Sequence, residues 1–316
     1  MVVPADGSPR HSQFSALPEL LRRGDLLVIN DTRVLPARIR FMWGGRDAEI
    51  LLLAEKRADV WECLLRPGKR VGSGIRLQLR PGLWADVLAR EPGGVFTVRF
   101  APPGRLAELL PEIGEAPLPP YIKERLEDPE RYQTVYARTP GSAAAPTAGL
   151  HFSDTMLTQL EAAGIGVASL TLHIGLDTFQ PLRVEDLDDH RMHSEAYEIP
   201  AATRAAIEAA RGRAGRVVAV GTTSARALEA AAAKRAAGEG SSADRGATDI
   251  FIRPGHAWRE VDLLLTNFHL PKSTLLVMVA AFAERERILR AYAEAIEHRY
   301  RFYSFGDAML LEPSRA

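Results

Sequence analysis

One stretch constrains the fold more than any other, because it predicts a buried strand that leads directly into a helix. Val261 and Leu263–Leu265 are apolar and suit a short strand buried on both faces. Leu275–Ala283 has the Leu, Met and Ala content of a buried helix, and either Ser273 or Thr274 is placed to cap its start. A strand end followed by a helix start is where α/β proteins bind ligands. We therefore predict an α/β fold.

Polar side chains fill the linker between these two apolar runs. Thr266, Asn267 and His269 lie there, ahead of the helix start. An ordinary capped turn is the simplest alternative, and it would account for the hydroxyl groups next to the helix. It does not account for an amide and an imidazole between two apolar runs. We therefore predict that Asn267 and His269 belong to a binding site.

Three further apolar runs end in the same way, at Leu26–Ile29, Val167–Leu172 and Val217–Val220. The polar groups that follow them are Asn30, Asp31, Thr32 and Arg33, then His173, Asp177 and Thr178, and finally Thr222, Thr223 and Ser224. The carboxyl ends of parallel strands lie at one edge of a sheet. We therefore expect all four polar clusters to meet at one cleft.

The turn Gly221-Thr-Thr-Ser, between a predicted strand and a predicted helix, has the features of an anion site. It offers unpaired N–H groups, hydroxyls and the positive end of a helix, which suit a carboxylate or a single phosphate. It lacks the lysine of a Walker A loop, so nucleoside triphosphate hydrolysis is not supported. Helix capping by the same hydroxyls is an equally good explanation.

The chain changes character between residues 37 and 100, where apolar and polar residues alternate. The alternating segments are Ala48–Leu53, Val60–Leu65, Gly74–Leu79, Trp84–Leu88 and Val95–Phe100. Turn pairs separate them without an intervening helical pattern, which is typical of a small antiparallel barrel or sandwich. Because α/β patterns flank this region, we predict a main α/β domain of residues 1–38 and 112–316. Residues 39–111 are then an inserted small antiparallel β-barrel domain.

Shorter segments complete the predicted organisation. Arg131–Tyr136 has β character, residues 238–247 predict a flexible surface loop, and Asp249–Ile252 predicts one more strand. Ala143–Phe152 combines small residues, which allow a ligand to approach the backbone, with His151.

The charge balance and the cysteine content exclude several classes of protein. Lys plus Arg equals Asp plus Glu at 40 each, so net charge does not favour nucleic acid. The single cysteine, Cys63, rules out an intramolecular disulfide and a multi-cysteine zinc site, and it suits a reducing cytoplasm. Its alternating surroundings predict a buried core thiol. No apolar run reaches transmembrane length, so we expect no membrane association.

Charge is nevertheless uneven within the predicted barrel. From Glu55 to Arg80, seven basic residues stand against three acidic ones. Arg66, Lys69 and Arg70 are part of this excess and predict contacts with nucleic-acid phosphates. A merely solvated β surface explains the charge equally well.

Other catalytic motifs are weak or missing. His190, His193 and Glu195 are spaced like metal ligands, but neither HExxH nor a cysteine set accompanies them. A hydrogen-bonding or acid–base role fits the two histidines better than a metal, and a solvent-exposed pair is the plain alternative. The absence of a GxSxG elbow and of a GxGxxG turn after a strand argues against serine hydrolases and dinucleotide-binding enzymes.

Taken together, the segments resemble the S-adenosylmethionine:tRNA ribosyltransferase-isomerases of queuosine biosynthesis. The matching stretches follow the order of that family and span Gly24 to Leu311. They are GDLLVINDTRVLPARI, PLPPYI, RYQTVYA, AAPTAGLHF, LHIGLDTFQPL, HRMHSEAYEI, VGTTSARALE, TDIFIRPG, VDLLLTNFHLPKSTLLVMVAAFA and YRFYSFGDAMLL. Each stretch alone is a weak signal, but the ordered set is highly specific.

The resemblance implies both the fold and the reaction. It implies an α/β main domain with an inserted small β-barrel, without a metal or a further cofactor. The ribosyl part of S-adenosylmethionine, as co-substrate, would be moved to 7-aminomethyl-7-deazaguanine at the wobble position of tRNA. Isomerisation would then give epoxyqueuosine, with adenine and methionine released. We expect a cytoplasmic monomer whose partners are tRNA and S-adenosylmethionine.

The implied chemistry needs a base near the positive sulfur, an acid for the departing adenine and a site for the methionine carboxylate. We expect His173, Asp177 and His269 to supply the acid and the base. Thr222, Thr223 and Ser224 would bind the carboxylate. The other expected substrate-binding residues are Asn30, Asp31, Thr32, Arg33, Thr147, His151 and Asn267.

One departure from the family concerns the start of the chain. Relatives begin with a further segment that has a DFDY-like start and an arginine-serine motif, ahead of a strand seen here as Met1-Val-Val. A start codon assigned too far downstream would explain the missing segment, and the full protein would then have no uncovered sheet edge. The alternative is a naturally shorter chain. A shortened, non-catalytic RNA-binding protein is therefore a second hypothesis. A metal hydrolase that uses His190 and His193 is a weaker third.

Overall fold

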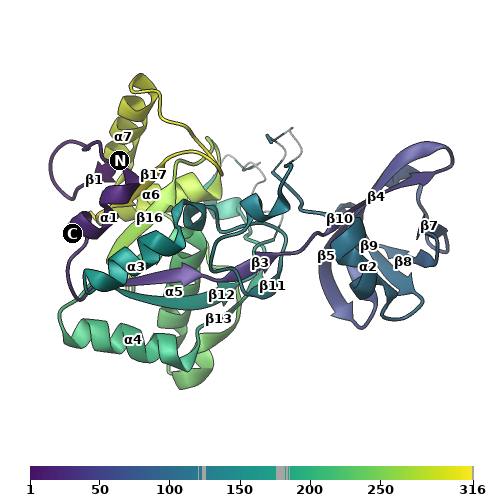
Figure 1. The fold of residues 1–316 in the computed structure, drawn as a ribbon, viewed down its shortest axis with the longest axis horizontal. Helices are drawn as coiled ribbons and strands as arrows, with labels where there is room; N and C mark the ends of the chain where they lie inside the picture. Colours follow the sequence, from purple (N-terminus) through teal and green to yellow (C-terminus); the bar gives the residue numbers. More distant parts are fainter. Residues whose placement is uncertain (120, 123–125, 176–181, 183, 185, 315–316) are drawn as a thin grey trace. The chain divides into compact units, whose positions relative to one another are not determined.

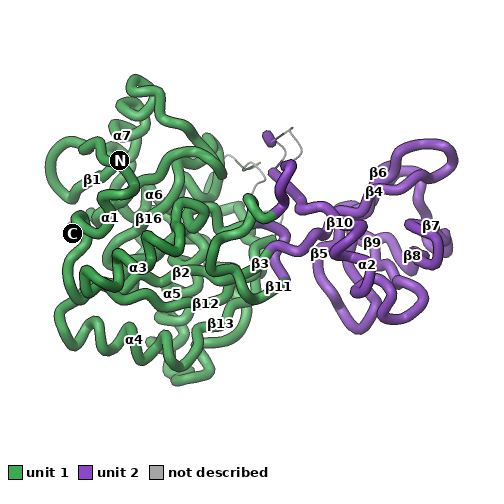
Figure 2. The backbone as a smooth tube through the Cα atoms, in the orientation of Figure 1, with its two compact units in different colours: residues 1–33, 130–140, 145–316 green, residues 34–129, 141–144 purple. Residues whose placement is uncertain are grey.

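The computed structural model describes residues 1–119, 121–122, 126–175, 182, 184 and 186–314. The chain forms two compact units (Figure 2). Unit 1 contains Met1–Arg33, Glu130–Pro140 and Ala145–Ala316, and unit 2 contains Val34–Pro129 and Gly141–Ala144. The predicted mixed α/β class is confirmed. No helix in these described ranges is long and apolar enough to cross a membrane.

Unit 1 is built on an eight-stranded sheet with the order β1-β17-β16-β14-β2-β12-β13-β15 (Figure 1). The strands are β1 (Val2–Val3), β2 (Leu26–Asn30), β12 (Gly166–Leu172), β13 (Glu195–Glu198), β14 (Val217–Val220), β15 (Arg245–Thr248), β16 (Leu263–Asn267) and β17 (Ala308–Leu311). The four central strands β16, β14, β2 and β12 run parallel to one another. They are the four apolar runs predicted from the sequence.

Helices cover both faces of this sheet. The helices of unit 1 are α1 (Leu17–Leu20), α3 (Asp154–Ala162), α4 (Ala201–Gly212), α5 (Gly221–Ala236), α6 (Thr274–Ala283) and α7 (Arg285–Glu297). On one face, Leu27 and Ile29 of β2 pack in a buried cluster with Met156 and Leu160 of α3. Helix α5 packs against the same central strands but lies outside that cluster, so it covers the opposite face.

Local signals explain where two of these helices begin. The Ser153 hydroxyl accepts a hydrogen bond from Met156 N at the start of α3, and the Ser273 hydroxyl accepts one from Leu276 N at the start of α6. Of the two candidate caps for the second helix, Ser273 is therefore the one used. Gly164 follows α3 with a φ of 77°, a conformation that favours glycine.

Unit 2 contains a curled antiparallel sheet with the order β10-β4-β5-β6-β9-β8-β7. Its elements are β4 (Arg38–Trp43), β5 (Arg46–Arg57), β6 (Val60–Arg66), β7 (Arg76–Arg80), β8 (Leu83–Arg90), β9 (Val95–Ala101), α2 (Arg105–Ile113) and β10 (Gly114–Glu115). Strands β4 and β7 pack together although they are not neighbours in the ladder, and Arg80 Nη1 donates to the Arg40 carbonyl at 2.9 Å. The sheet is thus a half-barrel. Cys63 is buried inside it, and burial raises the pKa of its thiol, as expected of a core thiol.

A short two-stranded sheet pairs β3 (Thr32–Val34) with β11 (Thr139–Ser142). The Leu35 N–H donates to the Ser142 carbonyl at 2.9 Å and extends this pairing.

Three local predictions were wrong. Asp249–Ile252 is not a strand; the preceding Arg245–Thr248 is, because it pairs with β13. Residues 238–247 are not a loop, since the 3-10 helix Gly240–Asp244 precedes that strand and buries Ala243. Arg131–Tyr136 forms no strand and begins within the 3-10 helix Pro129–Tyr132. For the strand Arg245–Thr248, pairing with the distant strand β13 outweighs local preference.

Candidate functional site

Three of the four predicted polar clusters contact one another at the carboxyl ends of the parallel strands, and Asn30 is the residue that joins them. Its amide nitrogen donates to the Leu172 carbonyl at 3.0 Å and to Thr223 Oγ1 at 3.2 Å. Its amide oxygen accepts from the backbone N–H groups of Thr32 and Leu172 at 3.2 and 3.0 Å. Asn30 is fully buried, so these four bonds tie the ends of β2 and β12 to the start of α5.

His173 follows β12 and stands next to this junction. Its Nδ1 shares a hydrogen bond with Thr32 Oγ1 at 2.9 Å. Burial lowers the pKa of His173, while the negative charge of Asp31 opposes the shift. The imidazole is therefore neutral at neutral pH, which is the form that can accept a proton.

Asp31 and Arg33 have partners within unit 1. The buried Asp31 carboxylate accepts from Thr171 Oγ1 at 2.6 Å and from Arg138 Nη2 at 2.7 Å. The Arg33 guanidinium pairs with Glu130. Asp31 thus fixes the end of β12 beside His173.

The start of α5 is the turn for which the sequence predicts an anion site. Thr222, Thr223 and Ser224 are all buried, and no side chain caps the first turn of the helix. The Ser224 hydroxyl has no hydrogen-bond partner in the described ranges of the chain. The helix begins at Gly221 with a φ of 86°, and a Cβ built there would lie 3.6 Å from Ala148 Cβ.

A buried carboxylate, Glu195, joins further parts of this region. Its oxygens accept from the Gly175 N–H at 2.9 Å and from His193 Nε2 at 2.9 Å, and they pair with Arg226 of α5. Burial would raise the pKa of Glu195, but the His193 hydrogen bond and the Arg226 charge outweigh burial, so the pKa is lowered. The ionised group holds β13, the segment after His173 and the beginning of α5 together.

The motif of His190, His193 and Glu195 does not predict Arg226 as a partner. An arginine within an Ala-rich helix was the available signal, because a charge there needs a partner. His190 packs edge-on against Phe251, with ring centroids 5.0 Å apart, whereas His193 pairs with Glu195. Among the residues described, no group of three His, Cys, Asp or Glu side chains is arranged to hold a metal.

A second cluster gathers at the end of β16. Thr147 Oγ1 donates to Asn267 Oδ1 at 3.1 Å, and Asn267 Nδ2 donates to His151 Nε2 at 3.3 Å. His151 stacks on Phe14, with ring centroids 5.0 Å apart. Burial lowers the pKa of His151 against the opposing charge of Asp307. Thr147 and His151 both belong to the 3-10 helix η5 (Thr147–His151), which packs against β16 and α5.

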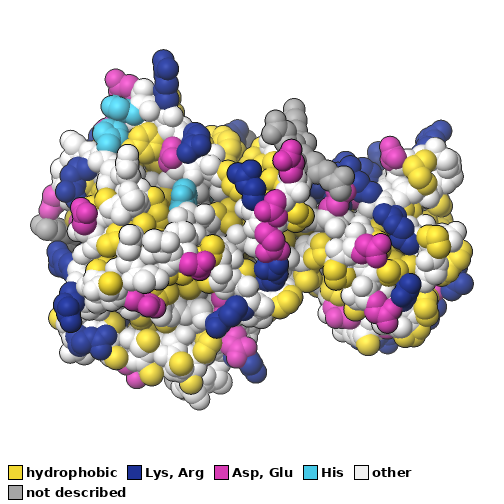
Figure 3. All heavy atoms as spheres, viewed as in Figure 1, with side chains coloured by type: hydrophobic (Ala, Val, Ile, Leu, Met, Phe, Trp, Pro, Cys, Tyr) yellow, Lys and Arg dark blue, Asp and Glu magenta, His cyan; other side chains and the backbone are white. Residues whose placement is uncertain are grey.

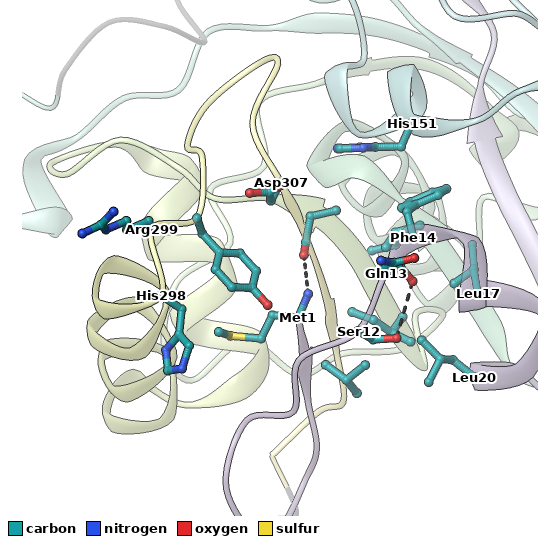
Figure 4. A pocket seen from close by; sticks show the side chains of 15 residues that line it. Met1, Ser12, Gln13, Phe14, Leu17, Leu20, His151, His298, Arg299 and Asp307 are labelled. Carbon is teal, nitrogen blue, oxygen red and sulfur yellow. Dashed lines mark hydrogen bonds between the residues drawn. The ribbon is translucent and has the colours of Figure 1, made fainter.

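A pocket of about 380 Å³ opens beside this second cluster. In Figure 4, His151 and Phe14 lie on one side of it and His298 and Arg299 on the other, with Asp307 between. Figure 3 shows histidine side chains at the surface of unit 1 near α7. Aromatic rings, a carboxylate and a neutral imidazole suit a planar polar ligand such as a nucleobase.

His269 is buried, whereas the other two candidate histidines, His151 and His173, are only half-buried. Its Nε2 bonds to Thr266 Oγ1 at 2.9 Å, and its backbone N–H donates to the Tyr292 hydroxyl at 2.7 Å. Burial lowers the pKa of His269 to about 3. It does not line the pocket of Figure 4. Asp177 and Thr178 lie outside the described residues.

The predicted phosphate-binding cations all lie in unit 2. Arg66 ends β6, and Lys69 and Arg70 belong to the 3-10 helix Gly68–Arg70. All three are exposed, and none forms an ion pair in the ranges that the structure describes. Lys56, by contrast, is paired with Glu62 at 2.8 Å. On the face of unit 2 shown in Figure 3, cations and carboxylates are interspersed.

Comparisons with known proteins agree on one family. A family model described as "Queuosine biosynthesis protein" matches residues 1–311. The chain is 51% identical over 312 residues to the S-adenosylmethionine:tRNA ribosyltransferase-isomerase of Moorella thermoacetica, covering 96% of this chain and 90% of that protein. It is 47% identical over 308 residues to the protein of the same name from Desulfitobacterium hafniense, covering 96% and 89%.

A solved structure is also similar. The crystal structure of S-adenosylmethionine tRNA ribosyltransferase from Thermotoga maritima matches with a TM-score of 0.53 and 34% sequence identity. The match covers 98% of this chain and 91% of that one.

Proposed function

The chain belongs to the queuosine biosynthesis protein family, and from this premise we propose that it is an S-adenosylmethionine:tRNA ribosyltransferase-isomerase. Its substrates are S-adenosylmethionine and tRNA that carries 7-aminomethyl-7-deazaguanine at the wobble position. The products are epoxyqueuosine-containing tRNA, adenine and methionine. Beyond family membership, one observation supports the proposal. The neutral imidazole of His173 lies beside the hydrogen-bonding groups of Asn30 and Thr223 at the carboxyl edge of the parallel strands.

The reaction begins with loss of a proton from the carbon beside the positive sulfur, and it needs an acid for the departing adenine. His173, Asp177 and His269 are the proposed acid–base residues. Among the described members of this set, His173 is the better base, since the pKa of about 3 makes His269 a weak one.

Substrate binding is assigned to the groups around these residues. Thr222, Thr223 and Ser224 at the start of α5 bind the methionine carboxylate, where N–H groups and the helix dipole favour an anion. Asn30, Asp31, Thr32 and Arg33 organise the neighbouring strand ends. Thr147, His151 and Asn267 bind a nucleobase or ribose beside the pocket.

Unit 2 is the part of the protein that we propose binds the tRNA backbone. Residues 39–111, which lie within unit 2, are the proposed inserted barrel domain, and Arg66, Lys69 and Arg70 contact tRNA phosphates from it. The protein acts as a monomer in the cytoplasm and uses no metal and no further cofactor.

Adenine release is the test of this proposal. Purified protein is incubated with S-adenosylmethionine and tRNA bearing 7-aminomethyl-7-deazaguanine, and adenine and modified nucleosides are quantified by mass spectrometry. We expect one adenine for each epoxyqueuosine formed. Binding of the tRNA without adenine release would support the alternative of a non-catalytic RNA-binding homologue and overturn the proposal.

A further inference from the structure

The segment between α7 and β17, residues 299–307, lies beside the candidate site; we call it the 299–307 loop. It leads into β17, whose first residue Ala308 pairs with Asn267 at the end of β16. The Tyr303 N–H donates to the Phe268 carbonyl at 2.9 Å. The loop is thus attached to the carboxyl edge of the sheet, where the predicted site residues gather.

Hydrogen bonds and close packing hold this loop in one shape. The Asp307 N–H donates to the Arg301 carbonyl at 2.7 Å, and the Arg301 N–H donates to the Asp307 carboxylate at 2.7 Å. Tyr303 adopts a φ of 74°, which is unfavourable for a residue other than glycine. A Cβ at Gly306 would lie only 2.4 Å from the Phe302 carbonyl carbon. Backbone strain of this kind is often retained at sites of function.

Most aromatic rings of the loop are used to fill the space beneath it. Phe302 packs against Phe268 and Tyr292, with ring centroids 5.0 and 5.7 Å apart. Phe305 differs, because 40% of it is exposed and its ring contact is with Tyr132, at 6.0 Å. No other Phe, Tyr or Trp in the described part of the chain is as exposed. Exposing this ring has no benefit for folding.

Exposed arginines lie in the two segments that carry Phe305 and its ring partner Tyr132. The Arg301 side chain is 79% exposed and lies 3.7 Å from Asp307, too loosely held for a strong ion pair. Arg299 is exposed in the same loop, and Arg131 is exposed next to Tyr132. An exposed aromatic ring flanked by arginines is the arrangement that binds single-stranded nucleic acid, since bases stack on the ring and phosphates pair with the cations.

We propose that the 299–307 loop is a docking platform for the single-stranded anticodon loop, with Phe305 stacked on an unpaired base and Arg301 paired with a phosphate. The inference rests on the proposed function, because tRNA is taken as the partner. A wobble base that enters a pocket must leave its stack, and a stacking surface for a neighbouring base offsets part of the energy that unstacking costs. A rigid loop provides this surface without a further ordering cost.

The test compares three variants in binding to an RNA hairpin that carries the anticodon loop. Phe305→Ala is expected to weaken binding roughly tenfold or more, and Phe305→Trp, which keeps a stacking ring, to stay close to wild type. Arg301→Ala should reduce the slope of log affinity against log salt by about 0.7. Ile296→Ala is the matched control, because this residue is also apolar and 66% exposed but lies in α7.

Adenine release by the same preparations separates this inference from the proposed function. We expect Phe305→Ala to raise the KM for tRNA and leave the KM for S-adenosylmethionine unchanged. If the wild-type protein releases adenine but Phe305→Ala binds the hairpin as tightly as wild type, the docking platform is overturned. The proposed function would still stand. A blunt RNA duplex that competes as well as the hairpin would also overturn the platform. A wild-type protein that releases no adenine would instead count against the proposed function.

Discussion

His173 and His269 carry the same side chain in two different environments, and this difference decides what each can do. His173 stands at the end of β12 with Thr32 as its partner, whereas His269 is buried against Thr266 and Tyr292. We expect His173→Ala to lower turnover by about 10²–10⁴, as is typical when an acid or base is removed. Thermal unfolding of the variant is measured in parallel. A collapse of stability that matches the fall in activity would make His173 a structural residue.

The low pKa of His269 predicts a pH dependence of stability. The unfolded chain takes up a proton at this side chain near pH 6.5, but the folded protein does so only near pH 3. The stability provided by a buried neutral imidazole is therefore complete above pH 6.5 and is lost as pH falls. Between pH 6.5 and pH 5 this amounts to roughly 2 kcal/mol of the free energy of unfolding. Urea unfolding of wild type and His269→Gln at several pH values measures it, and parallel curves would contradict the prediction.

The pair formed by Glu195 and Arg226 predicts non-additive substitutions. Glu195→Gln leaves a buried guanidinium without its counter-charge, which typically costs about 3–5 kcal/mol. Adding Arg226→Met removes that charge, so the double variant should recover most of the stability. Denaturant unfolding of the two single variants and the double variant gives the coupling energy. Simple additivity would mean that the two side chains do not stabilise each other.

At the scale of elements, the sequence predicts what is encoded locally. Neighbouring residues are enough to predict the four parallel strands, the cap Ser273 and the alternating strands of unit 2. The strand Arg245–Thr248 does not, because its ladder is formed with β13, far away in the sequence.

The candidate site shows the same division. The residue types at the strand ends were predictable, and so was their meeting at one edge. Their individual partners were not. Asn30 bonds to Thr223 across 193 positions, and Arg226 reaches Glu195 only because α5 packs on the strands next to β13. Such pairs depend on the strand order, which a single sequence does not reveal.

Lys69 and Arg70 are exposed in the 3-10 helix Gly68–Arg70, and we expect them to make tRNA binding depend on salt. Alanine at Arg66, Lys69 or Arg70 should weaken tRNA binding and reduce the salt slope by about one unit for each phosphate that is no longer neutralised. S-adenosylmethionine binding should be unaffected. Lys56→Ala is the control, since Lys56 is already paired with Glu62. An unchanged slope in all three variants would identify these cations as solvated surface.

For the whole molecule, the proposed reaction needs no metal to activate the substrate. The sulfur of S-adenosylmethionine is already positively charged, so it acidifies the adjacent carbon and makes methionine a good leaving group without a Lewis acid. We expect epoxyqueuosine and adenine to form at an unchanged rate after incubation with EDTA. Chelation also removes Mg²⁺ from tRNA, so the assay uses tRNA folded in high monovalent salt, with Mg²⁺ added back as the control. If chelation stops adenine release and Zn²⁺ or another transition metal restores it while Mg²⁺ does not, the enzyme depends on a metal of its own.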